Sequence, residues 1–155
     1  MKLTANFSLE ELTKSETALR MGLENEPNDE QLANLVALCE CVLQPVRDHF
    51  GKGVKVNSGL RTLPVNRAIG SADHSDHVKG MAADIEIPSI PNAELARFIV
   101  DSGMEFRQVI LEFYTPGIPD SGWVHVSYNP ADNKKQVLTA TKQNGKTVYL
   151  NGLVA

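Results

Sequence analysis

Ser75-Asp76-His77-Val78-Lys79-Gly80-Met81-Ala82-Ala83-Asp84 runs from a polar loop into an apolar strand that we expect over Ala83–Ile87. It places His77 on the loop and Asp84 at the start of the strand, with Gly80 between them. Glycine is the residue that a backbone needs where it turns sharply or approaches a neighbour closely. The stretch can therefore bring an imidazole and a carboxylate to one point.

A second histidine of interest lies on a later predicted strand, Trp123–Tyr128. Alternation along this strand places Trp123, His125 and Ser127 on one face and two valines on the other. Burying an imidazole costs free energy unless it has a polar partner. We therefore expect the face that carries His125 to border a cleft.

His77, Asp84 and His125 are together a sufficient ligand set for a catalytic zinc ion, which takes three protein ligands and keeps a fourth position open. Two imidazoles suit zinc better than calcium, so a calcium-dependent binding fold is disfavoured. The structural alternative is a surface His77, an Asp84 that ends a strand and a His125 bonded to a neighbouring backbone group. Residue types alone leave both interpretations open.

The first third of the chain shows the apolar period of helices. Three helical segments are expected there, over about residues 8–14, 15–21 and 29–50. Ser8 with Glu11 forms a capping-box pattern for the first segment, and Asn28 caps the third. Pro45 lies inside the third segment, where its missing N–H should kink or split the helix.

Beyond residue 53 the pattern changes to the short runs typical of strands. Candidate strands are Lys55–Asn57, Ala83–Ile87, Gln108–Phe113, Trp123–Tyr128, Gln136–Thr141 and Thr147–Leu150. One helix interrupts them, from an Asn92 cap to a stop at Gly103. Asn144-Gly145 is typical of a type I′ hairpin turn between the last two strands.

Helices first and strands later, joined mostly without crossover helices, predict an α+β fold in which N-terminal helices pack on a mainly antiparallel sheet. The sequence shows no repeat and no long Pro/Gly/Ser-rich linker, so we expect one domain over residues 1–155. Its expected parts are a helical region (1–53), the sheet and metal site (54–130) and a C-terminal hairpin (131–155).

Composition and charge exclude several classes of protein. The formal net charge of −4 argues against a general binder of nucleic acid or anionic membranes. No apolar stretch has the length of a signal peptide or a membrane span, so we expect synthesis in the cytoplasm without a signal peptide and no membrane insertion. Cys39 and Cys41 point to different faces of their helix, which disfavours a mutual disulfide and predicts two free thiols, Cys39 in the core and Cys41 near its edge.

The order Ser-x-His-x-x-Gly-x-Ala-x-Asp, followed by Trp-x-His on a later strand, resembles the zinc D-Ala-D-Ala carboxypeptidase family, which shares its fold with the hedgehog signalling domain. Three further segments are similar to phage and bacterial cell-wall peptidases of that family: Phe7-Ser8-x-x-Glu11-Leu12, Ser58-Gly59-Leu60-Arg61-Thr62 and Gln108-Val109-Ile110-Leu111-Glu112. The resemblance covers about residues 5–130 and implies a hedgehog/D,D-peptidase-like fold.

The resemblance implies a zinc ion bound by His77, Asp84 and His125. It also implies a catalytic acid, which in some relatives lies three residues before the last histidine, where this chain has Gly122. The members most similar to this sequence instead use a glutamate at the end of the preceding strand, here Glu112. Asp120, in the loop between the two strands, is the second candidate for the base.

Two further residues receive roles from the resemblance. Arg61 is expected in the cleft, where its guanidinium can hold a substrate carboxylate or the developing oxyanion, and the alternative is a surface arginine. Ser75 is expected either to bind substrate or to orient the loop. His74 and Asp76 flank His77 in the sequence, and we expect both side chains to be exposed.

The function implied is that of a zinc-dependent hydrolase that cleaves peptide bonds of bacterial peptidoglycan stem peptides by metal-activated water. A D-Ala-D-Ala carboxypeptidase and an endolysin-type endopeptidase both fit this chemistry. Such an enzyme could act on the cell wall after lysis, as a phage component, or in the cytoplasm as a dipeptidase. The expected partner is the peptidoglycan peptide, with no nucleic acid, and the chain is expected to be a monomer. The alternative is a catalytically weak or inactive zinc-containing module that binds the cell wall.

Overall fold

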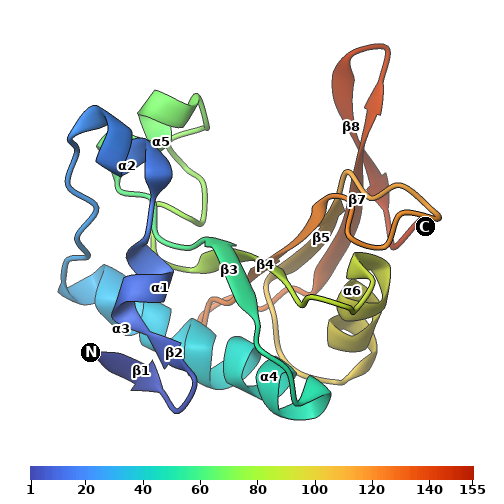
Figure 1. Ribbon diagram of the computed structural model, residues 1–155, viewed down its shortest axis with the longest axis horizontal. Coiled ribbons are helices and arrows are strands. Elements are labelled where there is room, and N and C mark those ends of the chain that lie inside the picture. The colour runs from blue at the N-terminus through green and yellow to red at the C-terminus, as the bar shows by residue number, and fades with distance from the viewer.

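A six-stranded sheet forms the C-terminal two thirds of the molecule together with two helices, and its strand order is β3-β4-β6-β5-β7-β8 (Figure 1). The computed structural model describes residues 1–155. The strands of this sheet are β3 (Lys55–Ser58), β4 (Ala82–Glu86), β5 (Gln108–Glu112), β6 (Trp123–Ser127), β7 (Gln136–Gln143) and β8 (Lys146–Asn151). All neighbours are antiparallel except β5 and β7, which are parallel.

Helices dominate the N-terminal part, after a short hairpin of β1 (Lys2–Thr4) and β2 (Phe7–Ser8). They are α1 (Leu9–Thr13), α2 (Glu16–Met21), α3 (Asp29–Leu38), a π-helical turn (Cys39–Leu43) and α4 (Gln44–Phe50), followed later by α5 (Leu63–Ile69) and α6 (Asn92–Asp101). A capping box opens α1 at Ser8 and Asn28 caps α3, as the sequence predicts, and Gln31 completes a second capping box with Asn28. None of these helices combines the length and the apolar composition that crossing a membrane requires.

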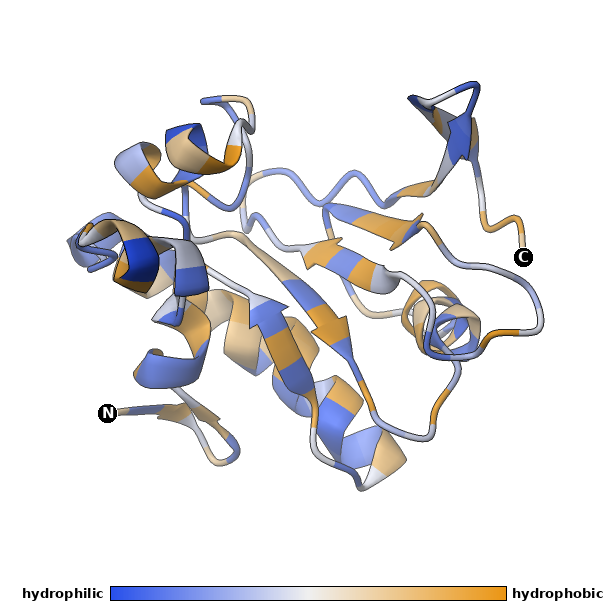
Figure 2. Cartoon of the chain, turned by 45° about the horizontal axis from the view of Figure 1, so that its top comes forward, coloured by the Kyte–Doolittle hydropathy of each residue, from blue (hydrophilic) through white to orange (hydrophobic).

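The core lies between the helices and one face of the sheet. Alternation along the strands sends one set of side chains into this core and the next set to the opposite face, and the strands carry alternating hydrophobic and hydrophilic bands (Figure 2). The core set from the sheet includes Ala83, Ile85, Val109, Leu111, Val124 and Val126, which pack with Leu35, Leu38, Val42, Leu95 and Ile99 of the helices. The opposite face is left free to line a cleft.

The expected α+β architecture is confirmed, and so is the break in the long helix. Between α3 and α4 the backbone widens into a π turn in which the N–H of Gln44 donates to the carbonyl of Cys39. The turn ends at Leu43, two residues before Pro45, whose ring and missing N–H are incompatible with a regular helix interior. Cys39 is buried and Cys41 half-buried, and both are free thiols, as expected.

The last two strands are longer than the sequence predicts, and their hairpin turn is confirmed. Asn144 and Gly145 both have positive φ values, 52° and 77°, which a type I′ turn requires. The strand expected to end at Phe113 stops instead at Glu112, because Phe113 adopts φ 57° and leaves the sheet.

The prediction that Asn92 caps α6 is wrong. Pro91 stands at the cap position, and Asn92 is the first helical residue, with its side chain only 1% exposed. The amide donates to Glu86 Oε1 and to the carbonyls of Ser121 and Gly122. Asn92 therefore bonds to other segments of the chain, a long-range role that local sequence pattern does not reveal. The short helix α5 was also not predicted.

Candidate metal centre

Three potential metal ligands converge at one point on the free face of the sheet. His77 comes from the loop between α5 and β4, Asp84 from β4 and His125 from β6, where Asp84 and His125 stand directly opposite each other. Asp84 Oδ1 lies 3.3 Å from His77 Nε2 and 3.1 Å from His125 Nδ1. One ligand atom from each residue lies within 4.8 Å of the other two. The sequence prediction that these residues meet is thus confirmed in geometry.

The loop that carries His77 is held by backbone contacts. The carbonyl of His77 accepts a hydrogen bond from the N–H of Arg61. Gly80 adopts φ 74°, and a Cβ there would lie 2.6 Å from the carbonyl oxygen of Gln31. The side chain of Gln31 in turn donates to the carbonyl of Val78 at 2.8 Å. The close approach expected at Gly80 is real, and it packs the loop against α3.

The imidazole of His77 is oriented by a carbonyl that can only accept. Its Nδ1 lies 2.8 Å from the carbonyl oxygen of Gly59, so Nδ1 carries the proton and donates. The unprotonated Nε2 then faces Asp84. Histidines that bind a metal through one ring nitrogen commonly donate the other N–H to a carbonyl or carboxylate in this way.

The charges of Asp84 and His77 match what a cation requires. Burial alone would raise the pKa of Asp84, but the two adjoining imidazoles outweigh it and hold that pKa well below its usual range, so the carboxylate is ionised. Burial lowers the pKa of His77 and favours its neutral form. Burial also acts to lower the pKa of His125, but its hydrogen bond and charge attraction to Asp84 prevail and raise it. Two imidazoles and a carboxylate, buried and aimed at one another, fit a zinc ion with one open position.

A cleft of about 780 Å³ opens over this cluster. Its lining comes from the loop before β4 and from five strands, and it includes all three potential ligands. Glu112 lies in the same cleft, at the end of β5, opposite Trp123 of β6. The indole Nε1 of Trp123 donates to Glu112 Oε2 at 2.7 Å, which fixes the carboxylate.

The pKa of Glu112 is raised above its ordinary value, chiefly by burial and then by the negative charge of Asp84. The positive charge on His125, the hydrogen bond from Trp123 and the charge of Arg61 oppose this shift. Asp120 has a different location. It is exposed and borders a separate hollow with Lys55 and Glu86, outside the cleft that holds the cluster.

Gly122 stands where some relatives carry their catalytic acid, and the backbone explains why no acid is found here. Its φ is 65°, and a Cβ at this position would collide with the carbonyl oxygen of Glu112 and the backbone of Phe113. A side chain at position 122 is therefore excluded by the path of the neighbouring segment.

Arg61 and Ser75 both line the cleft. Arg61 is half-buried, and its Nε atom is buried without a hydrogen-bond partner. Burial lowers the pKa of Arg61, while Asp84 and Glu112 oppose that shift. Ser75 Oγ accepts from the N–H of His77 at 3.3 Å, a bond that helps to shape the loop. The surface alternative for Arg61 is excluded, whereas the roles of both residues toward a substrate stay predictions.

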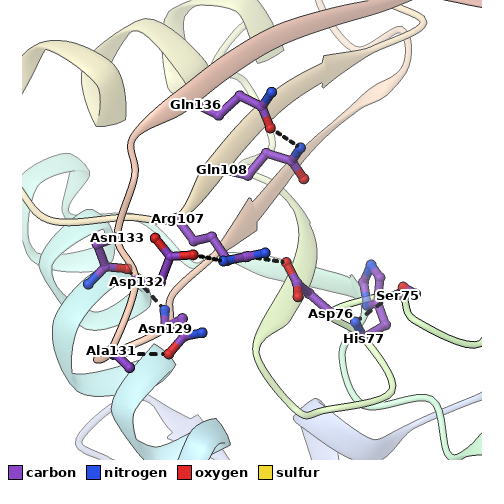
Figure 3. A network of polar contacts seen from close by, with 10 residues as sticks. All are labelled: Ser75, Asp76, His77, Arg107, Gln108, Asn129, Ala131, Asp132, Asn133 and Gln136. Atoms are coloured by element: carbon purple, nitrogen blue, oxygen red, sulfur yellow. Dashed lines mark hydrogen bonds and ion pairs between the residues drawn. The ribbon is translucent and has the colours of Figure 1, made fainter.

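The expectation that Asp76 is exposed is wrong, although His74 is exposed as expected. The side chain of Asp76 is only 12% exposed and accepts from Arg107 Nε at 3.1 Å. The same guanidinium donates to Asp132 at 2.6 Å, so Arg107 ties the metal-ligand loop to the segment before β7 (Figure 3). Arg107 was missed because an arginine 31 residues away in the sequence gives no local signal for this contact.

Comparison with known proteins agrees with this geometry. The sequence model of the Peptidase M15 family matches residues 5–127, a range that contains His77, Asp84, His125 and Glu112. No curated protein matches the chain. The range agrees with the resemblance drawn from the sequence motifs, and the α+β fold is consistent with that family. The chain belongs to the peptidase M15 family.

Proposed function

We propose that this protein is a zinc-dependent peptidase that hydrolyses peptide bonds in the stem peptides of bacterial peptidoglycan, with His77, Asp84 and His125 as the zinc ligands. Peptidases of the M15 family depend on zinc, and the cluster fits that ion. When bound, zinc would polarise the scissile carbonyl and lower the pKa of a coordinated water towards about 7.

The observation that carries this proposal is the placement of Glu112. It provides a buried carboxylate in the cleft that holds the ligand cluster. Trp123 binds Oε2, which leaves Oε1 of Glu112 free to accept a proton from the attacking water. Glu112 would then pass that proton to the amine of the leaving group, as a general base that becomes a general acid.

Arg61 supplies a positive charge to the cleft close to the ligand cluster. Its guanidinium is partly desolvated by burial, and the residue lines the cleft. A planar fork of N–H donors suits a substrate carboxylate or the oxyanion that develops during peptide hydrolysis. Ser75 holds the loop beside it and lies within the same cleft.

The experiment that tests this function is mass spectrometry of purified muropeptides after incubation with the zinc-loaded protein. Parallel incubations contain a chelator or the chelated protein resupplied with zinc. We expect products only where zinc is present. Released D-alanine would identify a carboxypeptidase, and split cross-links would identify an endopeptidase. Absence of any product from protein with full zinc content would contradict the enzyme and favour a wall-binding module.

A further inference from the structure

The floor of the cleft continues past the ligand cluster to the C-terminal hairpin. Cα partners form one row across five strands: Asp84 on β4, His125 on β6, Ile110 on β5, Leu138 on β7 and Asn151 on β8. All five residues line the same cleft. The row therefore joins the potential metal site to the far edge of the sheet along one continuous surface.

A second row runs beside the first on the same face. Trp123 pairs with Glu112, Glu112 with Ala140, and Ala140 with Tyr149 on β8. Ala140 is buried, whereas Tyr149 is 55% exposed and lines the cleft. A half-exposed aromatic ring thus stands at the end of the row that carries Glu112.

The length of this floor exceeds what a single terminal residue needs. Neighbouring strands lie about 4.8 Å apart, so the three steps from β6, which carries His125, to β8 span roughly 14 Å. An extended peptide advances about 3.4 Å per residue, so this distance accommodates about four residues. A terminal dipeptide would occupy only the end of the floor nearest the ligand cluster.

The part of the cleft floor farthest from the ligand cluster, on β7 and β8, lies outside the residues that match the family model. The match to the Peptidase M15 family ends at residue 127, before β7 and β8 begin. In Figure 1, α5 lies at the upper left and the β7–β8 hairpin at the upper right, toward opposite ends of the sheet. Ser71 and Ala72, just after α5, line the cleft at one end, and Tyr149 lines it on the hairpin.

We propose that the β7–β8 hairpin is a substrate-binding wall that holds an extended peptide arm of about four residues on one side of the scissile bond, with Tyr149 and Leu138 as its contacts. This inference rests on the proposed peptidase function and deepens it. An aromatic ring contributes large apolar area with few rotatable bonds, and its hydroxyl can bond to a peptide group. The protein would then prefer long or cross-linked stem peptides over short ones.

The test compares Tyr149→Ala with the wild type on two zinc-supported substrates, a short monomeric muropeptide and a cross-linked dimer. We expect Tyr149→Ala to raise the ratio of KM for the dimer to KM for the monomer at least fivefold over the wild-type ratio. Tyr149→Phe should restore most of the affinity, because it keeps the ring. Lys146→Ala is the matched control, since Lys146 is exposed on the opposite face of the same strand and does not line the cleft. The proposal would be overturned if the ratio of KM for the dimer to KM for the monomer were the same in Tyr149→Ala and in the wild type.

A binding measurement keeps the test independent of catalysis. Trp123 is the only tryptophan and lines the cleft, so its fluorescence reports occupancy. The cross-linked muropeptide should bind Tyr149→Ala at least fivefold more weakly than it binds the wild type. Circular dichroism verifies that both proteins are folded. If no substrate is cleaved but this difference is found, the peptidase function fails and the binding wall stands. Equal dissociation constants would overturn the wall whether or not cleavage occurs.

Discussion

Gly122 combines a positive φ with a backbone neighbour that occupies the space of a side chain. Replacing it with alanine should move the end of β5 and lower the free energy of unfolding by more than about 2 kcal/mol, since the left-handed backbone alone costs roughly 1–2 kcal/mol for a residue with a Cβ. Gly117→Ala is the control, because Gly117 also has a positive φ but meets no atom within 4 Å. Urea unfolding measures both variants. Equal losses would show that the collision is absent in solution.

Glu112 and Asp120 are the two acids between which the sequence alone leaves a choice. We expect Glu112→Gln to keep zinc and fold but to lower kcat by roughly 10²–10⁴, the usual contribution of a positioned general base. Asp120→Asn should have a much smaller effect, because Asp120 borders a different hollow. Steady-state hydrolysis of muropeptides, with zinc content measured on each variant, provides the comparison. The reverse ranking would assign the base to Asp120.

Among the elements, the start of α6 is joined to the sheet through the buried amide of Asn92. Asn92→Ala should cost about 1–3 kcal/mol of unfolding free energy, because it removes donors to Glu86 and to two carbonyls near Gly122. Asn57→Ala is the matched control, since Asn57 donates to the same carboxylate from an exposed position. Thermal unfolding of both variants gives the comparison. A loss in Asn57→Ala as large as in Asn92→Ala would contradict the anchoring role.

Elements with a local signal were predicted well, and those set by distant contacts were not. Capping by Ser8 and Asn28, and the break at Pro45, follow from chemistry within one turn of helix. The helix α5 is short, buries only Val65 and Asn66, and so shows no apolar period. The parallel pairing of β5 with β7 is likewise invisible locally, because strand order is decided by packing and not by the strands' own residues.

Over the whole molecule, the motif predicted which residues meet but not the surface around them. His77, Asp84 and His125 could be named from the sequence because the family motif fixes their spacing. The rows of residues that cross from β4 to β8 could not be predicted from the sequence, because they depend on the register of five strands. Arg107 joins the site through its ion pair with Asp76, and Tyr149 through the register of β8.

The same three residues should be individually necessary for metal binding. His77→Ala, Asp84→Asn and His125→Ala should each lower zinc content, because three ligands leave no redundancy. Elemental analysis of the purified variants against the wild type measures the loss. His74→Ala is the control, as His74 is exposed beside the loop and outside the cluster. Full zinc occupancy in any of the three variants would remove that residue from the ligand set.

The most direct measurement is a zinc titration of chelator-treated protein, followed by the rate of muropeptide hydrolysis. A site made of His77, Asp84 and His125 holds one ion per chain. We expect the rate to start near zero, to rise in proportion to added zinc and to level off at one equivalent. Full hydrolysis in the presence of chelator, or no hydrolysis after one equivalent of zinc has bound, would contradict a zinc peptidase.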